Sequence, residues 1–183
     1  MPSAGPGVPS ASSGRLRRRR GARTSPVPGG GKPHQEIERK FLVQELPKNL
    51  ARFPHSRIEQ GYLALGAGGL QVRLRRAGQK HSLTYKRETG RVRHEREVVL
   101  TPEQFAVLWP ATFGQRLTKI RYDVPFGKHV IEIDIYRGRH QGLVVAEVEF
   151  QNDRAARAFR PPPWLGKDVT GSPRYSNVLL ACK

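Results

Sequence analysis

The sequence predicts a mainly β fold of the α+β class, in which eight antiparallel strands close into a barrel with a charged interior, accompanied by a few short helices. Three observations lead to this fold class. Apolar and polar residues alternate with a period of two over most of the chain from His34 onward, which indicates strands. The connections between these segments are too short for parallel crossovers. Eight strands with only three short helical segments favour a sheet closed on itself.

The strands are predicted in chain order from this alternation. Hairpin turns are expected at Gly78-Gln79 and Thr89-Gly90, and a third turn is expected within residues 124–129. The predicted strands lie near residues 35–44, 57–65, 70–77, 81–88, 91–100, 114–124, 128–137 and 143–150.

Three short helices are expected between and after the strands. Thr101 is a typical N-cap residue and Pro102 a typical first helical residue, so one helix should span about 102–109. Asn or Asp at the start of 152–159 predicts a second helix, and residues 176–181 indicate a third.

The first 33 residues differ in composition from the rest of the chain. They are rich in Pro, Gly, Ser and Arg, contain seven basic and no acidic residues, and offer almost nothing to bury. Residues 1–33 are therefore expected to form a disordered basic tail, and residues 34–183 a single tunnel domain. The arginine cluster at 15–20 could contact nucleic acid, which we do not expect the rest of the chain to bind.

Composition narrows the classes of function. The formal net charge of +18 and the isoelectric point near 11.1 favour a polyanionic partner. Cys182 is the only cysteine, which excludes an intrachain disulfide and a cysteine-based metal site. No apolar run approaches the ~18 residues of a membrane span, and no secretory signal is evident. We expect a cytoplasmic protein without membrane contact.

The charges of the predicted strands form like-signed pairs. Residues i and i+2 of a strand share one face of the sheet. The acidic pairs are Glu36/Glu38, Glu95/Glu97, Glu132/Asp134 and Glu147/Glu149; the basic pairs are Arg73/Arg75 and Lys119/Arg121; Lys40, Lys86 and Arg93 are further strand cations. For any single strand a solvated face is the simpler interpretation. Solvated faces usually mix signs, however, because like charges repel at ~7 Å along a strand. Six unmixed pairs are better explained if these faces converge on the barrel interior.

A barrel lined by ionisable side chains is unstable without ligands of both signs. Carboxylate oxygens are typical ligands of Mg²⁺ or Mn²⁺, and arginine and lysine bind compact polyanions. Carboxylates, a divalent cation and a cationic cage together are typical of phosphoryl transfer. The apolar strand faces would then point outward. Three short helices cannot cover eight strands, so a homodimer interface is expected to cover the remainder.

The ordered motifs resemble the CYTH, or triphosphate tunnel metalloenzyme, superfamily. The ExExK signature of that family matches EIERKFLV at 36–43. It is followed by QGYL (60–63), VRLRR (72–76), LTYK (83–86), RHERE (93–97), TKIRY (118–122), IEID (131–134), EVEF (147–150) and RYSN (174–177). LWPAT at 108–112 and RPPPWLG at 160–166 are most similar to the short bacterial inorganic triphosphatases. The N-terminal extension departs from the family, whose members usually begin close to ExExK.

The resemblance implies a tunnel that hydrolyses tripolyphosphate to pyrophosphate and phosphate with two Mg²⁺ or Mn²⁺ ions, one bridging phosphate oxygens and one helping to generate the attacking water. It implies metal ligation by Glu36, Glu38, Glu132, Asp134, Glu147 and Glu149, and triphosphate binding by Lys40, Arg73, Arg75, Lys86, Arg93, Lys119, Arg121 and Arg174. Lys40, Glu36 and Glu38 are expected to act most directly in catalysis.

Supporting roles are implied less specifically. Glu95 and Glu97 would take part at the metal end or orient the cations, with the second role preferred. Tyr62 would lie near the substrate or pack in the barrel wall. Arg39 has the opposite parity to Lys40 and is expected to point out of the tunnel.

Three alternatives stay open. Another triphosphate hydrolase, acting on a nucleoside or thiamine triphosphate, would use the same tunnel. An adenylate cyclase of the same superfamily would need to hold a nucleoside, and no separate base-recognition motif is evident. A non-catalytic polyphosphate- or nucleic-acid-binding module would use the positive charge. The eight acidic residues of the four pairs argue against that module, because they would repel a polyanion unless metals intervene.

Overall fold

The computed structural model describes residues 37–89 and 92–182, without the side chains of residues 88, 89, 92 and 93. The predicted tail, Glu36 and Gly90 lie outside these residues, as does the side chain of Arg93. Within the described residues no helix is long and apolar enough to cross a membrane.

Nine strands form a single antiparallel sheet within the described part of the chain, in the order β5-β4-β3-β2-β6-β7-β8-β1-β9. The strands are β1 (Ile37–Val43), β2 (His55–Gly66), β3 (Leu70–Ala77), β4 (Lys80–Thr89), β5 (Val92–Leu100), β6 (Arg116–Phe126), β7 (His129–Tyr136), β8 (Val144–Phe150) and β9 (Leu165–Asp168). The helices are α1 (Pro102–Leu108), α2 (Asp153–Ala158) and α3 (Asn177–Cys182), with 3-10 turns η1 (Leu50–Arg52), η2 (Trp109–Thr112), η3 (Gly138–His140) and η4 (Pro173–Tyr175).

The eight predicted strands are β1 to β8, each within two residues of its expected bounds, and the three predicted helices are also confirmed. Glycines with positive φ make two of the predicted turns, Gly78 at 57° and Gly127 at 59°. Helix α1 begins with a capping box, because the Thr101 hydroxyl accepts a hydrogen bond from the Gln104 amide and the Gln104 side chain accepts one from the Thr101 amide.

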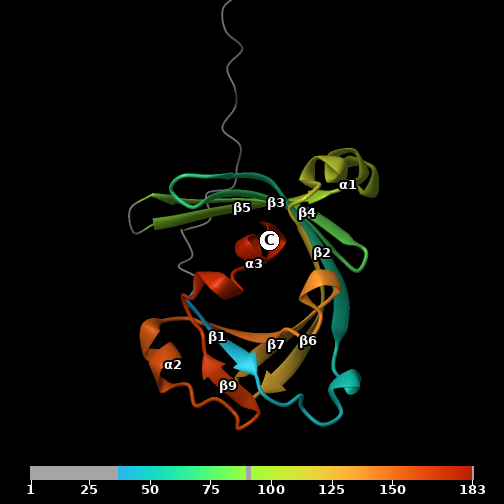
Figure 1. Ribbon diagram of the computed structural model, residues 1–183. Coiled ribbons are helices and arrows are strands. Elements are labelled where there is room, and N and C mark those ends of the chain that lie inside the picture. The colour runs from blue at the N-terminus through green and yellow to red at the C-terminus, as the bar shows by residue number, and fades with distance from the viewer. Residues whose placement is uncertain (1–36, 90–91, 183) are drawn as a thin grey trace, which may run out of the picture. The chain divides into compact units, whose positions relative to one another are not determined.

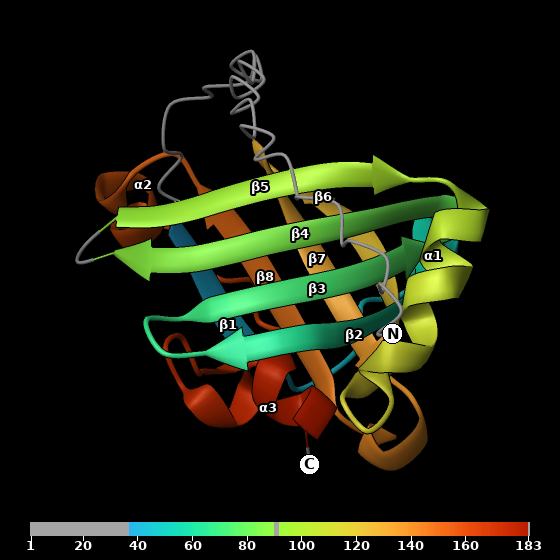
Figure 2. The same cartoon turned by 90° about the horizontal axis from the view of Figure 1, so that it is seen from above.

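The sheet has two halves that face each other. It bends between β2 and β6, so that β5, β4, β3 and β2 lie opposite β6, β7, β8 and β1 (Figure 1). The strands of the two halves cross at an angle when seen from above (Figure 2). Helix α3 lies between the halves, where Leu180 and Ala181 pack against Tyr62, Leu117 and Tyr136. This helix therefore covers one end of the space between the halves.

The predicted closed eight-stranded barrel differs from this sheet in two respects. The sheet has a ninth strand, and its edge strands β5 and β9 are not hydrogen-bonded to each other in the described residues. The free edge of β1 is occupied instead by the segment that contains β9, because the Val169 amide donates to the Lys40 carbonyl at 2.8 Å and Phe41 pairs with Asp168. A strand edge that is already paired cannot also close a barrel with β5.

The main apolar core lies outside the two halves, as the charge pattern predicts. Buried Ile131, Ile133 and Val148 point away from the charged face and pack beneath α2 and Phe159. On the opposite half, Val98 of β5 has the outward parity and stays 57% exposed. Helix α2 and the following segment thus cover one outer face, and the homodimer stays a prediction.

Candidate active site

A cavity of about 260 Å³ lies between the two halves of the sheet. Most of the residues predicted from the like-signed pairs line it. They are Glu38, Lys40, Tyr62, Arg73, Arg75, Lys86, Glu95, Glu97, Lys119, Arg121, Glu132, Glu147 and Glu149. The alternation along the strands brings these side chains together, since β1, β3, β4, β6, β7 and β8 all turn their charged parity inward.

Asp134 anchors a buried ion-pair network on β6 and β7. Arg121 donates to both of its carboxylate oxygens, from Nε at 2.7 Å and from Nη2 at 2.6 Å, and Lys119 donates to it as well. The Lys119 side chain is 1% exposed and that of Asp134 0%. Burial lowers the pKa of the Lys119 ammonium to about 8, although the Asp134 charge opposes this shift. Asp134 thus lies behind the cavity wall, where it fixes the two cations.

Glu147 extends this network to the first strand. Its carboxylate contacts Lys40 Nζ at 2.8 Å and Arg121 Nη2 at 2.7 Å, and β1 and β8 place it directly opposite Lys40. Burial alone would raise the pKa of the Glu147 carboxyl. The positive charges of Lys119, Lys40 and Arg121 outweigh burial and hold this pKa well below its usual value of 4.5. Glu147 is therefore ionised and paired.

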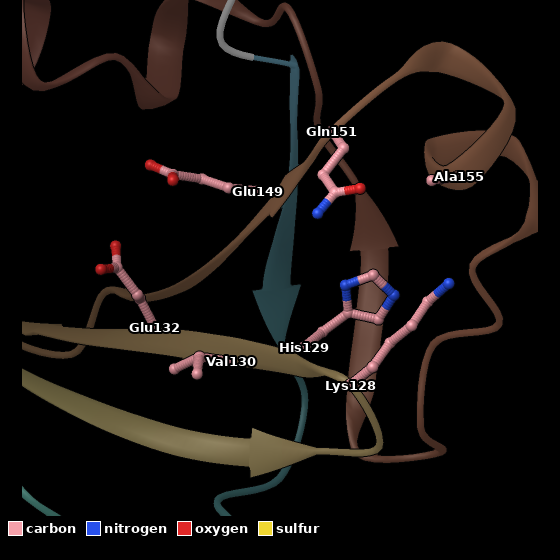
Figure 3. A pocket seen from close by; sticks show the side chains of 7 residues that line it. All are labelled: Lys128, His129, Val130, Glu132, Glu149, Gln151 and Ala155. Atoms are coloured by element: carbon pink, nitrogen blue, oxygen red, sulfur yellow. The ribbon is translucent and has the colours of Figure 1, made fainter.

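Glu132 and Glu149 lie beside this network, and Arg121 Nη1 also donates to Glu132. Their carboxylates reach from β7 and β8 into the same space, beside a second cavity of about 300 Å³ that His129 and Gln151 also line (Figure 3). Burial raises the pKa of Glu132 above its usual 4.5. The charges of nearby carboxylates, including Glu149, raise it further, although Arg121 opposes them. An added cation would relieve this crowding of negative charge.

The opposite half of the sheet presents cations with few partners. The Nε atoms of Arg73 and Arg75 are buried and, among the described residues, donate no hydrogen bond. Arg73 Nη2 donates to the hydroxyl of Thr84 at 3.1 Å. Burial, then the charges of Arg121 and Arg73, lower the pKa of Arg75 below its usual value. These guanidinium groups are positioned to receive an anion.

Strands β4 and β5 add two supporting contacts. Lys86 and Glu95 form an ion pair of 2.6 Å, and their backbones are directly opposite in the register. The Thr84 hydroxyl donates to Glu97 at 2.9 Å while accepting from Arg73. Glu97 therefore orients Arg73 through Thr84, in line with the predicted supporting role of the Glu95/Glu97 pair.

Several lining residues were missed by the sequence interpretation. They are Gln60, Gln71, Ser176, Asn177 and Val178. Gln60 shares the parity of Tyr62 and donates to its hydroxyl at 3.1 Å, so strand alternation could have identified it. Burial raises the pKa of Tyr62 to about 12, which keeps its hydroxyl protonated. Asn177 reaches the cavity through α3, where it accepts from the Tyr136 hydroxyl at 2.6 Å, and no strand pattern signals that contact.

Besides Asp134, three predicted residues lie apart from the cavity or cannot be placed. Arg174 is exposed, lies 5.8 Å from the Tyr175 ring centroid and does not line the cavity. Glu36 and the side chain of Arg93 are outside the described structure. Arg39 points away from the cavity, as expected, and donates to Asp168 at 2.6 Å. The substrate role of Arg174 is thus unsupported by its position.

The donor set suits a hard divalent cation, but the side chains are not arranged around one. Glu38, Glu132, Glu147 and Glu149 all line the cavity, and carboxylate oxygens are the usual ligands of Mg²⁺ and Mn²⁺. Within residues 37–89 and 92–182, no three acidic, histidine or cysteine side chains are close enough together to hold an ion as they stand. Lys40 and Arg121 contact three of these carboxylates, those of Glu38, Glu132 and Glu147, so cation binding there requires an exchange of partners.

Comparisons with known proteins agree with this geometry. Residues 34–158 match the model of the CYTH domain. The chain is 43% identical over 149 residues to an inorganic triphosphatase of Nitrosomonas europaea, covering 80% of this chain and 96% of that protein. It is 35% identical over 150 residues to an inorganic triphosphatase of Acetivibrio thermocellus, covering 80% and 92%. A crystal structure of an inorganic triphosphatase superposes with a TM-score of 0.65 at 39% identity, covering 81% of this chain and 95% of that one. The chain belongs to the CYTH domain family.

Proposed function

We propose that the chain hydrolyses inorganic triphosphate to pyrophosphate and phosphate in the cavity between the two halves of the sheet, with Mg²⁺ or Mn²⁺ as cofactor. The observation that carries this proposal is the pair of half-buried arginines Arg73 and Arg75. Their Nε atoms are buried without partners in the described structure, and they face carboxylates across one cavity. The relatives of similar length are called inorganic triphosphatases, which supports the choice of substrate.

The cationic half would bind the triphosphate. Arg73 and Arg75 offer forked donors to phosphate oxygens, and Lys86 lies on the neighbouring strand of the same cavity. Lys40 and Arg121 would contribute from the opposite half, once the substrate or a cation competes for their carboxylates. These donors would offset the negative charge that develops on the departing pyrophosphate.

The acidic half would hold the cofactor. Glu38, Glu132, Glu147 and Glu149 are the proposed ligands among the described residues, and Glu36 joins them on the basis of the ExExK motif. When bound, Mg²⁺ or Mn²⁺ would polarise phosphate oxygens and lower the pKa of a water molecule. Two ions per site stay a prediction.

Asp134 receives a different role from the one implied by the resemblance. It is fully buried behind the cavity wall and held by Arg121 and Lys119. We therefore propose that Asp134 is a positioning residue that orients the two cations, and that it does not ligate the cofactor.

The test of the function is a substrate panel with the full-length chain. Phosphate release should be greatest with tripolyphosphate and Mg²⁺ or Mn²⁺, and should be abolished by EDTA or by Glu38→Gln. Glu45→Gln, which changes an exposed acidic residue next to β1, is the matched control and should keep full activity. Faster turnover of ATP or thiamine triphosphate would contradict the substrate assignment, and cyclic AMP formed from ATP would favour the cyclase alternative.

The homodimer and the cytoplasmic location also stay proposals. Exposed Val98 and Val99 lie on edge strand β5, which makes this edge the candidate dimer interface. Light scattering at micromolar concentration tests the dimer directly, and a monomer mass would contradict it.

A further inference from the structure

A second concentration of positive charge lies on the outer face of the sheet, away from the active-site cavity. A pocket of about 320 Å³ is lined by Arg57, Arg116, Leu117, Thr118, Arg137, Gly138, Arg139 and His140. Four of these residues are arginines, and none of the described lining residues carries a carboxylate. It shares no lining residue with the active-site cavity. We call this site the outer basic pocket.

Three segments of the fold bring these cations together. Arg57 lies on β2, which pairs with β6, so that Thr118 is opposite Glu59 and close to Arg57 on the outer face. The chain after β7 returns to the same place, because the Arg137 amide donates to the Thr118 carbonyl at 2.9 Å. Arg139 Nη2 then donates to the Arg116 carbonyl at 3.0 Å. The pocket is therefore built by paired backbone and not by loose surface side chains.

Within residues 37–89 and 92–182, most of this charge is not neutralised. Arg116 donates to the Thr112 hydroxyl at 2.7 Å and to the Trp109 carbonyl, and Arg139 donates to the Leu180 carbonyl at 3.3 Å. These acceptors are uncharged, so they fix the guanidinium groups while leaving their positive charge in place.

Among the described residues, one arginine of the pocket has an acidic partner. Arg57 contacts Glu59 at 3.1 Å, and Arg76 from outside the pocket contacts the same carboxylate. Arg137 is exposed at the pocket. The net charge of the outer basic pocket is therefore strongly positive, and an anion bound there would gain from several charges at once.

The size and donors of the pocket indicate the class of ligand. Ligand pockets span roughly 300–1,000 Å³, so this one suits a small molecule better than a polymer lying across the surface. Guanidinium forks match phosphate oxygens. Cations from three segments surround the space, which suits an anion with more than one phosphoryl group. We propose that the outer basic pocket is a second binding site for a small condensed phosphate, for which pyrophosphate is the probe.

The test is calorimetric titration of pyrophosphate into the full-length chain in EDTA, compared with Arg57→Ala/Arg137→Ala. These two side chains are exposed and are not the ones that hold α3 or η2, so both can be removed without breaking the described packing. The parent should bind at an outer site in addition to the active-site cavity. The double variant should lose that component, with affinity at the outer site about tenfold weaker or more. The matched control is Arg154→Ala/Arg157→Ala on α2, which removes the same charge from another exposed surface.

The results separate this site from general charge attraction and from the proposed active site. Equal stoichiometry and affinity in the parent and the double variant would overturn the proposal, as would an equal loss in the α2 control. Hydrolysis of tripolyphosphate should proceed at the parent rate in Arg57→Ala/Arg137→Ala. Loss of the outer-site proposal and loss of the proposed function would therefore give different results. If the double variant shows a lower thermal midpoint, the titration is repeated with the single variant Arg137→Gln. Unchanged pyrophosphate binding in that variant would equally overturn the proposal.

Discussion

The inner faces of the two halves of the sheet hold their charges in opposite ways. On β6, β7, β8 and β1 the buried cations are already paired, with Arg121 bound to Asp134 and Glu147 and with Lys40 bound to Glu147. On β3 the buried Nε atoms of Arg73 and Arg75 have no partner among the described residues. The cations Lys40 and Arg121 of one half are therefore paired without a ligand, whereas two buried donors of the other half are not.

This difference assigns separate tasks to the two halves. A paired buried network fixes its members, and removing one member leaves an uncompensated charge. An unpartnered buried donor instead costs about 1–3 kcal/mol in the free protein, a cost that an anion can remove. We therefore expect substitutions in the first half to reduce stability and those on β3 to reduce binding and turnover.

Asp134→Ala should have the largest effect on stability. It leaves Lys119 and Arg121 buried without their main carboxylate, so the free energy of unfolding should fall by about 3–5 kcal/mol. Urea denaturation of the parent and the variant in EDTA measures this difference in the free energy of unfolding. A loss below about 1 kcal/mol, the range of exposed pairs, would show that the network does not hold this half together.

Arg75→Ala should have the largest effect on activity. Loss of a donor to the triphosphate should reduce kcat/KM for tripolyphosphate by about 10²–10³-fold. The free energy of unfolding should stay equal or rise, because a buried unpartnered cation has been removed. The neighbouring Arg76→Ala is the matched control, since Arg76 points outward to Glu59. Equal activity losses in the two variants would break the contrast between the faces.

Acid should weaken the paired half through Glu147. The folded-state pKa of this carboxyl is depressed, so its contribution to stability is fully present above the usual value near 4.5. As pH falls below 4.5, the unfolded chain takes up the proton first and the contribution is progressively lost. The free energy of unfolding, measured from pH 6 to pH 3 in EDTA, should fall more steeply in the parent than in Glu147→Gln. Parallel pH profiles would contradict this role of Glu147.

Arg39→Ala should have the smallest effect on function. Its guanidinium bonds Asp168 and the Ala156 and Phe159 carbonyls on the outer face, so its loss should cost roughly 1–2 kcal/mol of stability. Activity with tripolyphosphate should be retained, whereas Lys40→Ala should reduce it strongly. Steady-state kinetics of both variants checks the contrast, and a comparable loss in Arg39→Ala would show that parity on β1 does not separate the two roles.

Strand alternation is sufficient to predict most of the charged side chains that line the cavity. It assigns the face of every charged residue on a strand. It therefore predicts that Glu132, Arg73 and Arg75 point inward, without knowledge of their contacts. Strand alternation does not show how deeply a side chain is buried behind the cavity wall. Asp134 has the inward parity, yet Arg121 and Lys119 separate it from the cavity.

The remaining features depend on contacts between distant segments. Strand β9 has only four residues, LGKD, and no apolar alternation, so its pairing with β1 leaves no local signal. Without a signal for that pairing, the alternation of the other eight strands predicts a closed barrel. The described strands instead form an open hydrogen-bond order that ends at β9. Asn177 enters the site through the packing of α3 against Tyr136, which no strand period encodes.

The most direct test of the two-halves account is the binding of tripolyphosphate in EDTA, when turnover is prevented. Calorimetric titration should give a clearly weaker affinity for Arg75→Gln than for the parent. Glu38→Gln, which abolishes hydrolysis in Mg²⁺, should bind as tightly as the parent or more tightly, because it removes negative charge from the cavity. Parent-like affinity in Arg75→Gln, or lost affinity in Glu38→Gln without cation, would contradict the division of the site into an anion-binding half and a cation-binding half.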